Sequence, residues 1–220
     1  MANILHHETV IILDFGSQYT QLIARRVREA GVYCEILPFD TSLAEIKTRT
    51  PKGLILSGGP SSVYDKDSPK PQPKLLQSVD CPVLGICYGL HVFAGELGGS
   101  VEASPSREFG YARLKILDGE SRLFKGLPQE MDVWMSHGDR VTAVPPGFRV
   151  TAVTDDALNA MEDETRQIFA GAVSPRGGAH TVRGAGNPKL FVRGLWLPWR
   201  LVTGSCYRRT DFADSRATWE

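Results

Sequence analysis

The segment Gly85-Ile86-Cys87-Tyr88-Gly89 places a cysteine between two glycines, after an apolar run and before a helical pattern. This is the pattern of a nucleophile elbow, a sharp turn that lifts a reactive side chain out of a strand end. Glycines let the strand and the helix approach closely, and a helix N-terminus favours thiolate over thiol. We therefore predict that Cys87 is an accessible nucleophile with a lowered pKa. The alternative is a buried structural cysteine, since free cysteine is commonly a core residue.

A second glycine pair, Gly58-Gly59, follows an apolar run in the segment LSGGPSS. Backbone N–H groups in such a turn can point at a substrate carbonyl and form an oxyanion hole. We expect Gly59 to supply one of these donors and the N–H of Tyr88 to supply the other, beside Cys87.

Short apolar runs alternate with helical patterns through the first half of the chain. They predict strands over residues 10–15, 32–39, 53–60 and 83–87 and helices over residues 17–31, 42–49 and 88–99. A polar, proline-rich segment over residues 61–73 predicts a surface loop. Four β-like runs then follow with little helix between them, over residues 109–117, 131–137, 148–154 and 166–170. We predict an α/β fold with a central, mostly parallel sheet and an antiparallel extension.

Five segments together resemble the class I, triad-type glutamine amidotransferase domain of GMP synthetases. They are DFGSQYTQLIARRVRE, GLILSGGPSSVY, GICYGLH, REFGY and WMSHGDRV, in this order between residues 8 and 170. The resemblance implies a flavodoxin-like fold and hydrolysis of glutamine through a cysteine thioester. It implies that the ammonia serves the amination of XMP to GMP in an ATP-using synthetase domain or subunit. This partner lies beyond the sequence given and would hold the ATP and Mg²⁺, so we expect no cofactor in residues 8–170.

The resemblance also implies roles for residues in these segments. Cys87 is the nucleophile, and Gly59 and Tyr88 are the oxyanion donors. The substrate-binding residues implied are Gly58, Ser136, His137 and Asp139.

Two of the matching positions leave a question open. Asp139 belongs to the same wall as Ser136 and His137, or it faces the synthetase partner. His91 stands where such enzymes usually carry a glutamine that holds the substrate, which puts the affinity for glutamine in question.

The base of the triad is missing from its expected place. The family carries a histidine and a glutamate on a late FHPE-like motif, because a thiolate nucleophile needs a proton donor for the leaving amine and a carboxylate to orient it. Here the corresponding segment reads RQIFAGAVSPRGG, and neither His137 nor His180 is followed by proline and glutamate. Residues 171–220 also contain eight Lys and Arg against three Asp and Glu, in a chain with zero formal net charge.

A reading-frame shift of one nucleotide after Ala170 would explain both changes. Residues 171–180 can be back-translated so that the frame one nucleotide later encodes VQFHPEVVH, and residues 192–201 so that it encodes YEVCGCHGDW, which resembles the end of the family's domain. The histidine and glutamate would have stood at Ser174 and Arg176, and neither present side chain can do their work. We predict an incomplete domain over residues 8–170, an aberrant and irregular tail over residues 171–220, and impaired catalysis. The alternative is a genuine, divergent C-terminus.

The composition of the chain argues against several classes of partner. The chain has no basic block, so neither nucleic acid nor an anionic membrane is implied as a partner. No apolar stretch approaches the roughly 20 residues of a membrane span, and the first residues lack a signal-peptide pattern. The four cysteines have no disulfide or metal spacing. We therefore predict a cytoplasmic protein with reduced thiols and no metal site.

Two other functions fit the same residues. One is a different cysteine hydrolase on the same elbow, with His137 or His180 as its base. The other is a non-catalytic module that binds glutamine and regulates a synthetase.

Overall fold

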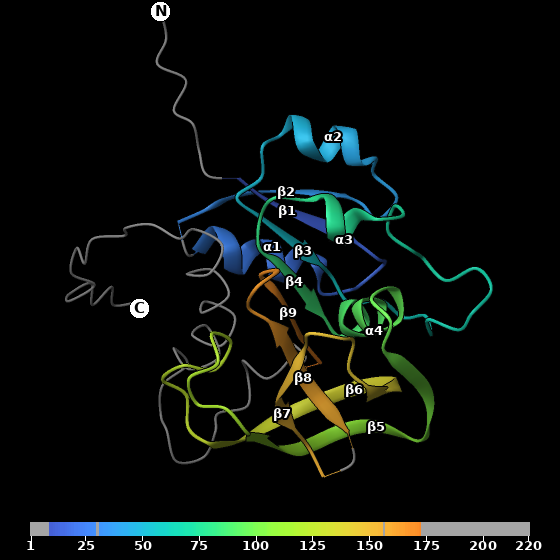
Figure 1. Cartoon of the computed structure of the whole chain (residues 1–220), viewed down its shortest axis with the longest axis vertical. Helices are drawn as coiled ribbons and strands as arrows, with labels where there is room; N and C mark the ends of the chain where they lie inside the picture. The colour runs from blue at the N-terminus through green and yellow to red at the C-terminus, as the bar shows by residue number, and fades with distance from the viewer. Residues whose placement is uncertain (1–8, 30, 156, 173–220) are drawn as a thin grey trace, which may run out of the picture.

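Nine strands form one sheet that is parallel at one end and antiparallel at the other (Figure 1). The structure is a computed structural model, and it describes residues 9–29, 31–155 and 157–172, without the side chains of residues 105–109, 134, 136 and 137. The tail predicted over residues 171–220 therefore lies outside the described residues, apart from Gly171 and Ala172.

The strands and helices follow one another in a simple order. The strands are β1 (Thr9–Asp14), β2 (Tyr33–Pro38), β3 (Gly53–Leu56), β4 (Val83–Ile86), β5 (Ser100–Ile116), β6 (Glu130–Ala143), β7 (Arg149–Val153), β8 (Leu158–Asp163) and β9 (Ile168–Gly171). The helices are α1 (Thr20–Glu29), α2 (Leu43–Thr48), α3 (Leu75–Ser78) and α4 (Tyr88–Glu96).

The parallel end of the sheet has the strand order β2-β1-β3-β4-β9. All residues of β3 and β4 are buried, as are the four central residues of β1, because parallel strands covered on both faces read as continuous apolar runs. Helix α1 packs on β1 and β2, and α4 packs on β4 and β9. The predicted alternation of strands and helices is confirmed here. Ser42 caps α2, since its hydroxyl accepts a hydrogen bond from the Glu45 N–H at 3.2 Å.

The antiparallel end is formed by β5 to β8. β5 and β6 form a long hairpin, and β7 pairs with both β5 and β8, so that β8, β6, β5 and β7 close into a four-stranded ring. Figure 1 shows this ring at the opposite end of the molecule from β1 and β2. The predicted antiparallel extension is confirmed for this part.

The prediction is wrong for one side of β9, which we expected in the antiparallel extension. β9 returns to the parallel end and pairs with β4 in parallel, and it is antiparallel only to β8. The local pattern of β9 could not indicate this, because its partner β4 lies about 80 residues earlier in the chain.

Two elements were not predicted, α3 and β8. The β8 sequence LNAMED ends in two acidic residues, which is atypical of a buried strand. Yet Glu162 is completely buried and accepts hydrogen bonds from Arg149, and Asp163 is buried and paired with Arg166. Arg149 on the neighbouring strand β7 and Arg166, three residues after Asp163, thus let β8 enter the core despite its charges. No helix in the described part of the chain is long and apolar enough to cross a lipid bilayer.

Candidate active site

Cys87 lies at the sharp corner between β4 and α4. Its φ of 50° and ψ of −102° are sparsely populated for a residue with a side chain. Such a conformation persists only where the surrounding structure holds it, and it is common at functional sites. The corner therefore holds the thiol at the carboxyl end of β4, as the glycine pattern predicts.

The glycines around Cys87 are required by close backbone approaches. A Cβ atom added to Gly85 would lie 2.7 Å from the carbonyl carbon and oxygen of Gly89. A Cβ atom added to Gly89 would lie 2.9 Å from the carbonyl oxygen of Leu56, the last residue of β3. Side chains at these positions would push α4 away from β3 and β4.

The thiol of Cys87 is half-buried and lies against the backbone at the end of β9. Its Sγ atom donates to the carbonyl oxygen of Ala172 at 3.4 Å, and its backbone N–H donates to the carbonyl of Gly171 at 2.9 Å. Burial raises the pKa of the Cys87 thiol to about 12. The predicted lowering of the pKa is therefore wrong in this structure, because desolvation disfavours the thiolate and the acceptor beside it stabilises the protonated form.

The diglycine turn lies directly beside Cys87. A Cβ atom on Gly58 would stand 3.6 Å from the Cβ of Cys87, and one on Gly59 would stand 2.9 Å from the carbonyl oxygen of Phe15 and 3.3 Å from the Tyr88 ring. Tyr88 opens α4, so its N–H is one of the amides for which the helix has no acceptor. The structure thus brings the expected oxyanion donors and the thiol together.

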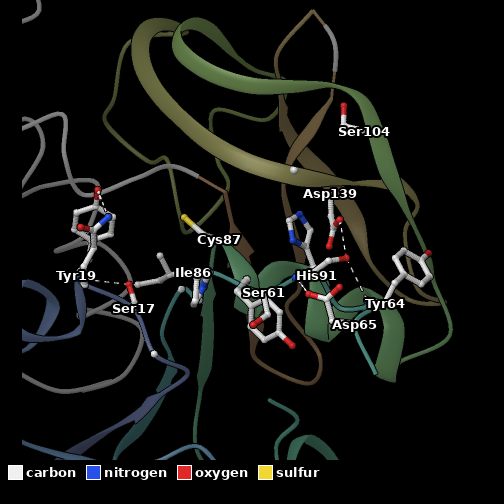
Figure 2. Close-up of a pocket in the computed structure, with 18 of the residues that line it drawn as sticks. Ser17, Tyr19, Ser61, Tyr64, Asp65, Ile86, Cys87, His91, Ser104 and Asp139 are labelled. Atoms are coloured by element: carbon white, nitrogen blue, oxygen red, sulfur yellow. Dashed lines mark hydrogen bonds between the residues drawn. The ribbon is translucent and has the colours of Figure 1, made fainter. Parts of the chain in front are cut away.

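A cavity of about 900 Å³ opens at the carboxyl ends of β1, β3 and β4 and reaches β6 (Figure 2). Glycine and polar side chains predominate in its wall. The lining residues are Gly16, Ser17, Gln18, Tyr19, Ile23, Gly58, Gly59, Pro60, Ser61, Ser62, Tyr64, Asp65, Ile86, Cys87, Tyr88, His91, Ala103, Ser104, Gly138 and Asp139. A cavity of this size accommodates a small molecule.

The other expected site residues lie in or near this wall. Asp139 is 5% exposed, and its two carboxylate oxygens accept hydrogen bonds from the Ser62 hydroxyl at 3.0 Å and the Val63 N–H at 3.1 Å. His91 is buried in α4 and also lines the cavity. Ser136 and His137 belong to β6, but their side chains lie outside what the structure describes.

Several parts of the wall were not assigned from the sequence, and one of them is the loop from Gly16 to Tyr19 after β1. The Ser17 hydroxyl accepts a hydrogen bond from the Tyr19 N–H at 3.0 Å, and it would lie 3.4 Å from a Cβ on Gly58. The signal was present, because ligands in open α/β sheets bind outside the carboxyl ends of the strands. The loop after β1 ends at the same edge as those after β3 and β4.

The positions where we expected the triad histidine and glutamate, Ser174 and Arg176, lie outside the described residues, as does His180. The residues just before them are in place. β9 pairs with β4 so that Gly171 stands opposite Ile86, and the Ala172 carbonyl reaches the Cys87 Sγ. The chain therefore leaves β9 beside the thiol.

Comparison with protein families gives a match over residues 11–171 to the family "Glutamine amidotransferase class-I". Among curated proteins, the GMP synthase (glutamine-hydrolysing) of Elusimicrobium minutum is 48% identical over 203 residues, which cover 89% of this chain and 39% of that protein. That of Hahella chejuensis is 46% identical over 217 residues, covering 92% and 41%. The chain thus spans about two fifths of the length of these relatives.

Solved structures of the same fold exist. A protein of Thermoplasma acidophilum, whose name assigns it to the GMP synthases, matches with a TM-score of 0.74 and 28% identity, over 91% of this chain and 99% of that one. A glutamine amidotransferase of Thermotoga maritima matches with a TM-score of 0.65 and 17% identity, over 91% of this chain and all of that one. The second likeness shows the fold alone.

Proposed function

The chain belongs to the class I glutamine amidotransferase family, and on this basis we propose that it is the glutamine-hydrolysing part of a GMP synthase. One observation carries the proposal. Cys87 stands at a left-handed corner, next to a diglycine turn, in the wall of a cavity that fits a small molecule. The names of its relatives point to the same activity.

In the proposed reaction, the Cys87 sulfur attacks the carboxamide carbon of glutamine. The carbonyl oxygen gains negative charge, which the N–H groups of Gly59 and Tyr88 would stabilise. The C–N bond then breaks, the nitrogen takes up a proton and leaves as ammonia, and a glutamyl thioester remains on the sulfur. Water hydrolyses the thioester to glutamate and restores the thiol.

The proposed destination of the ammonia is an ATP-using synthetase domain or subunit, which aminates XMP to GMP. The greater length of the relatives supports a further part of this kind. We expect the ATP and the Mg²⁺ to bind there and glutamine to bind at Cys87. A cytoplasmic location fits this function and stays a prediction.

We further propose that this chain hydrolyses glutamine close to the background rate. The Cys87 thiol with a pKa of about 12 is almost entirely protonated at neutral pH. A thiol in this state needs a base, and the sequence has serine and arginine at positions 174 and 176. The family match ends at residue 171, where the charge balance of the chain also changes. The matches to the curated relatives cover 89% and 92% of the chain and so run past this residue, and the proposed frame shift after Ala170 therefore rests on the sequence pattern.

Restoring the two missing side chains tests this proposal. The double variant Ser174→His/Arg176→Glu keeps Pro175 and recreates the order His-Pro-Glu. Ammonia release from glutamine should rise by about 10²- to 10⁴-fold, the usual contribution of a positioned general acid–base. Adding Cys87→Ala should abolish the gain, and Ser174→Ala/Arg176→Ala is the matched control without a base.

Two results would contradict the proposal in different ways. Cys87-dependent turnover in the unaltered chain would show that another base serves the thiol, as in the alternative hydrolase with His137 or His180. A coding sequence whose bases cannot be realigned to encode His-Pro-Glu after Ala170 would reject the shifted frame.

The raised pKa of Cys87 also favours a second function, a glutamine-binding module without catalysis. In that case the unaltered chain binds glutamine but releases no ammonia. Calorimetric titration with glutamine tests this function. If the chain does not bind glutamine, both the binding module and the amidotransferase are excluded.

A further inference from the structure

We propose that Asp139 is a positioning residue, which acts on the reaction by holding the diglycine turn and with it the oxyanion donor of Gly59. The inference rests on the proposed function, since it assigns a role within the same site. It differs from the substrate-binding role that the resemblance implies for Asp139, because the residue acts through the turn.

The turn is held at its beginning by Ser57, which is completely buried. The Ser57 N–H donates to the Leu13 carbonyl at 3.0 Å, and its hydroxyl accepts from the Phe15 N–H at 3.0 Å and donates to the Gly58 carbonyl at 2.9 Å. These bonds tie the start of the turn to the end of β1. None of these bonds reaches the later part of the turn, which therefore needs another anchor.

Asp139 holds the other end of the turn from β6. Its carboxylate oxygens accept from the Ser62 hydroxyl at 3.0 Å and from the Val63 N–H at 3.1 Å, across 77 and 76 residues of chain. Figure 2 shows the Asp139 side chain directed from β6 towards this loop. Gly59 therefore lies between two anchors, one from β1 and one from β6.

The chemistry of this contact explains why it can fix a position. Asp139 is 5% exposed, and a buried carboxylate is costly unless hydrogen bonds satisfy it. Bonds to an ionised acceptor are about twice as strong as those between neutral groups. The Ser62 hydroxyl in turn accepts from the Tyr64 N–H at 3.2 Å, and the Ser62 N–H donates to Asp65 at 2.9 Å. These two bonds lie within the loop and stiffen it, so displacing the loop from β6 would break both bonds to Asp139 together.

The position of the turn matters because an oxyanion donor works only at a defined distance from the developing charge. Losing the anchor at Asp139 should let Gly59 move relative to Cys87. The thiol itself would stay in place, since the corner at Cys87 is held by the packing of Gly85 and Gly89. Damage to the turn is therefore separable from damage to the nucleophile.

Two alkylating reagents can distinguish, in the full chain, damage to the diglycine turn from damage to the nucleophile. The first is the chloroketone analogue of glutamine, L-2-amino-4-oxo-5-chloropentanoate, which needs the glutamine pocket and whose carbonyl oxygen would occupy the oxyanion hole. In its reaction the Cys87 sulfur bonds to the methylene carbon, chloride leaves and the thiol proton passes to water. The second is iodoacetamide, which needs only the accessible thiolate. The ratio of the two rates, at one pH, removes the effect of thiol ionisation.

For Asp139→Ala we expect the ratio to fall by about tenfold or more, within the range for loss of an oxyanion donor, while the iodoacetamide rate stays within about twofold. Asp139→Asn should keep most of the ratio, because the amide oxygen can accept from Val63 and the amide nitrogen can donate to Ser62. Asp132→Ala, an exposed position on the same strand, is the matched control and should leave the ratio unchanged.

The outcomes separate this inference from the proposed function. An unaltered chain that shows no preference for the chloroketone, and no protection by glutamine, overturns both. A normal preference that Asp139→Ala leaves intact overturns the inference alone. Equal losses in Asp139→Ala and Asp139→Asn would assign the carboxylate to direct contact with the ligand. If Asp139→Ala does not fold, Ser62→Ala decides, since it removes one of the two bonds and should lower the ratio several-fold.

Discussion

The two ends of the sheet are held together in different ways. In the parallel end, β1, β3 and β4 are apolar and buried, and α4 approaches them so closely that Gly85 and Gly89 admit no side chain. In the antiparallel end, buried charged side chains form ion pairs and hydrogen bonds with residues of other elements. Glu162 is completely buried there and bonds to both Arg149 and Ser121.

The site combines both kinds of stabilisation. The nucleophile belongs to the apolar end, so its position comes from backbone packing and its pKa is set by burial. The antiparallel end reaches the site through the polar side chain of Asp139. Changes at the apolar end should therefore act through packing and desolvation, and changes at the other end through lost hydrogen bonds and charge.

The largest effect should appear in the reactivity of Cys87. A pKa of about 12 in place of the ordinary 9.0 lowers the thiolate fraction near neutral pH by roughly a thousandfold. The rate of iodoacetamide alkylation should therefore rise about tenfold per pH unit with no plateau below about pH 11, measured by mass spectrometry of the Cys87 peptide. The chain unfolded in urea is the control, and its Cys87 should reach half its maximum rate near pH 9 and a plateau above about pH 10.

The raised pKa of Cys87 also makes the stability of the fold depend on pH. The folded state holds the thiol proton more tightly than the unfolded state, so this contribution is complete below about pH 9 and is lost as the pH rises towards 12. An alkylation plateau near neutral pH in the folded chain would show that a charged group reaches the thiol, which would break the contrast between the two ends.

The second effect is a loss of stability at the corner. Gly85→Ala places a Cβ atom 2.7 Å from backbone atoms of Gly89, which cannot move without shifting α4. The free energy of unfolding, measured with urea, should fall by about 3 kcal/mol, the upper range for overpacking.

Gly95→Ala is the matched control on the same helix. Gly95 is exposed and has no heavy atom within 4 Å of an added Cβ, so this change should raise the stability by about 0.5–1 kcal/mol. A similar small change for Gly85→Ala would mean that packing does not fix the corner.

The third and smallest effect concerns the buried charge of the antiparallel end. Arg149→Ala leaves Glu162 with only Ser121 as a described partner. Because the Arg149 side chain is 49% exposed, we expect a loss of about 2 kcal/mol, below the range for a fully buried pair. The surface pair Arg113–Glu130 of β5 and β6 offers the control, since Arg113→Ala should cost about 0.5 kcal/mol or less. Equal losses in urea unfolding would contradict a distinct role for the buried carboxylate.

The sequence allowed more to be predicted for the apolar end than for the polar one. β1 to β4 have local signals, because each is an apolar run bounded by glycine, proline or polar residues. β8 has no such signal, since its two acidic residues enter the core only when paired. Glu162 bonds to Arg149 on β7, and Asp163 bonds to Arg166, three residues after it. Long-range pairing also decides the place of β9, which a local pattern cannot indicate.

The same limit applies to the site. The glycine spacing around Cys87 predicts the corner, because the steric need is local. The pKa of Cys87 was predicted in the wrong direction, since burial depends on β9 bringing Ala172 against the sulfur. The bonds from Ser62 and Val63 to Asp139 join segments far apart in the sequence. Only the folded arrangement reveals them.

The closed ring at the antiparallel end also affects how copies of the chain can associate. β7 has a neighbour on both sides, and β2 has a partner on one side alone along its whole length. β5 and β6 have a second partner only near one end, at Lys115 and Ile116 and at Val141. Edge strands are where a foreign strand can extend a sheet and start aggregation. At β2 such growth is limited by Pro38, which at the strand end offers no N–H to an incoming chain.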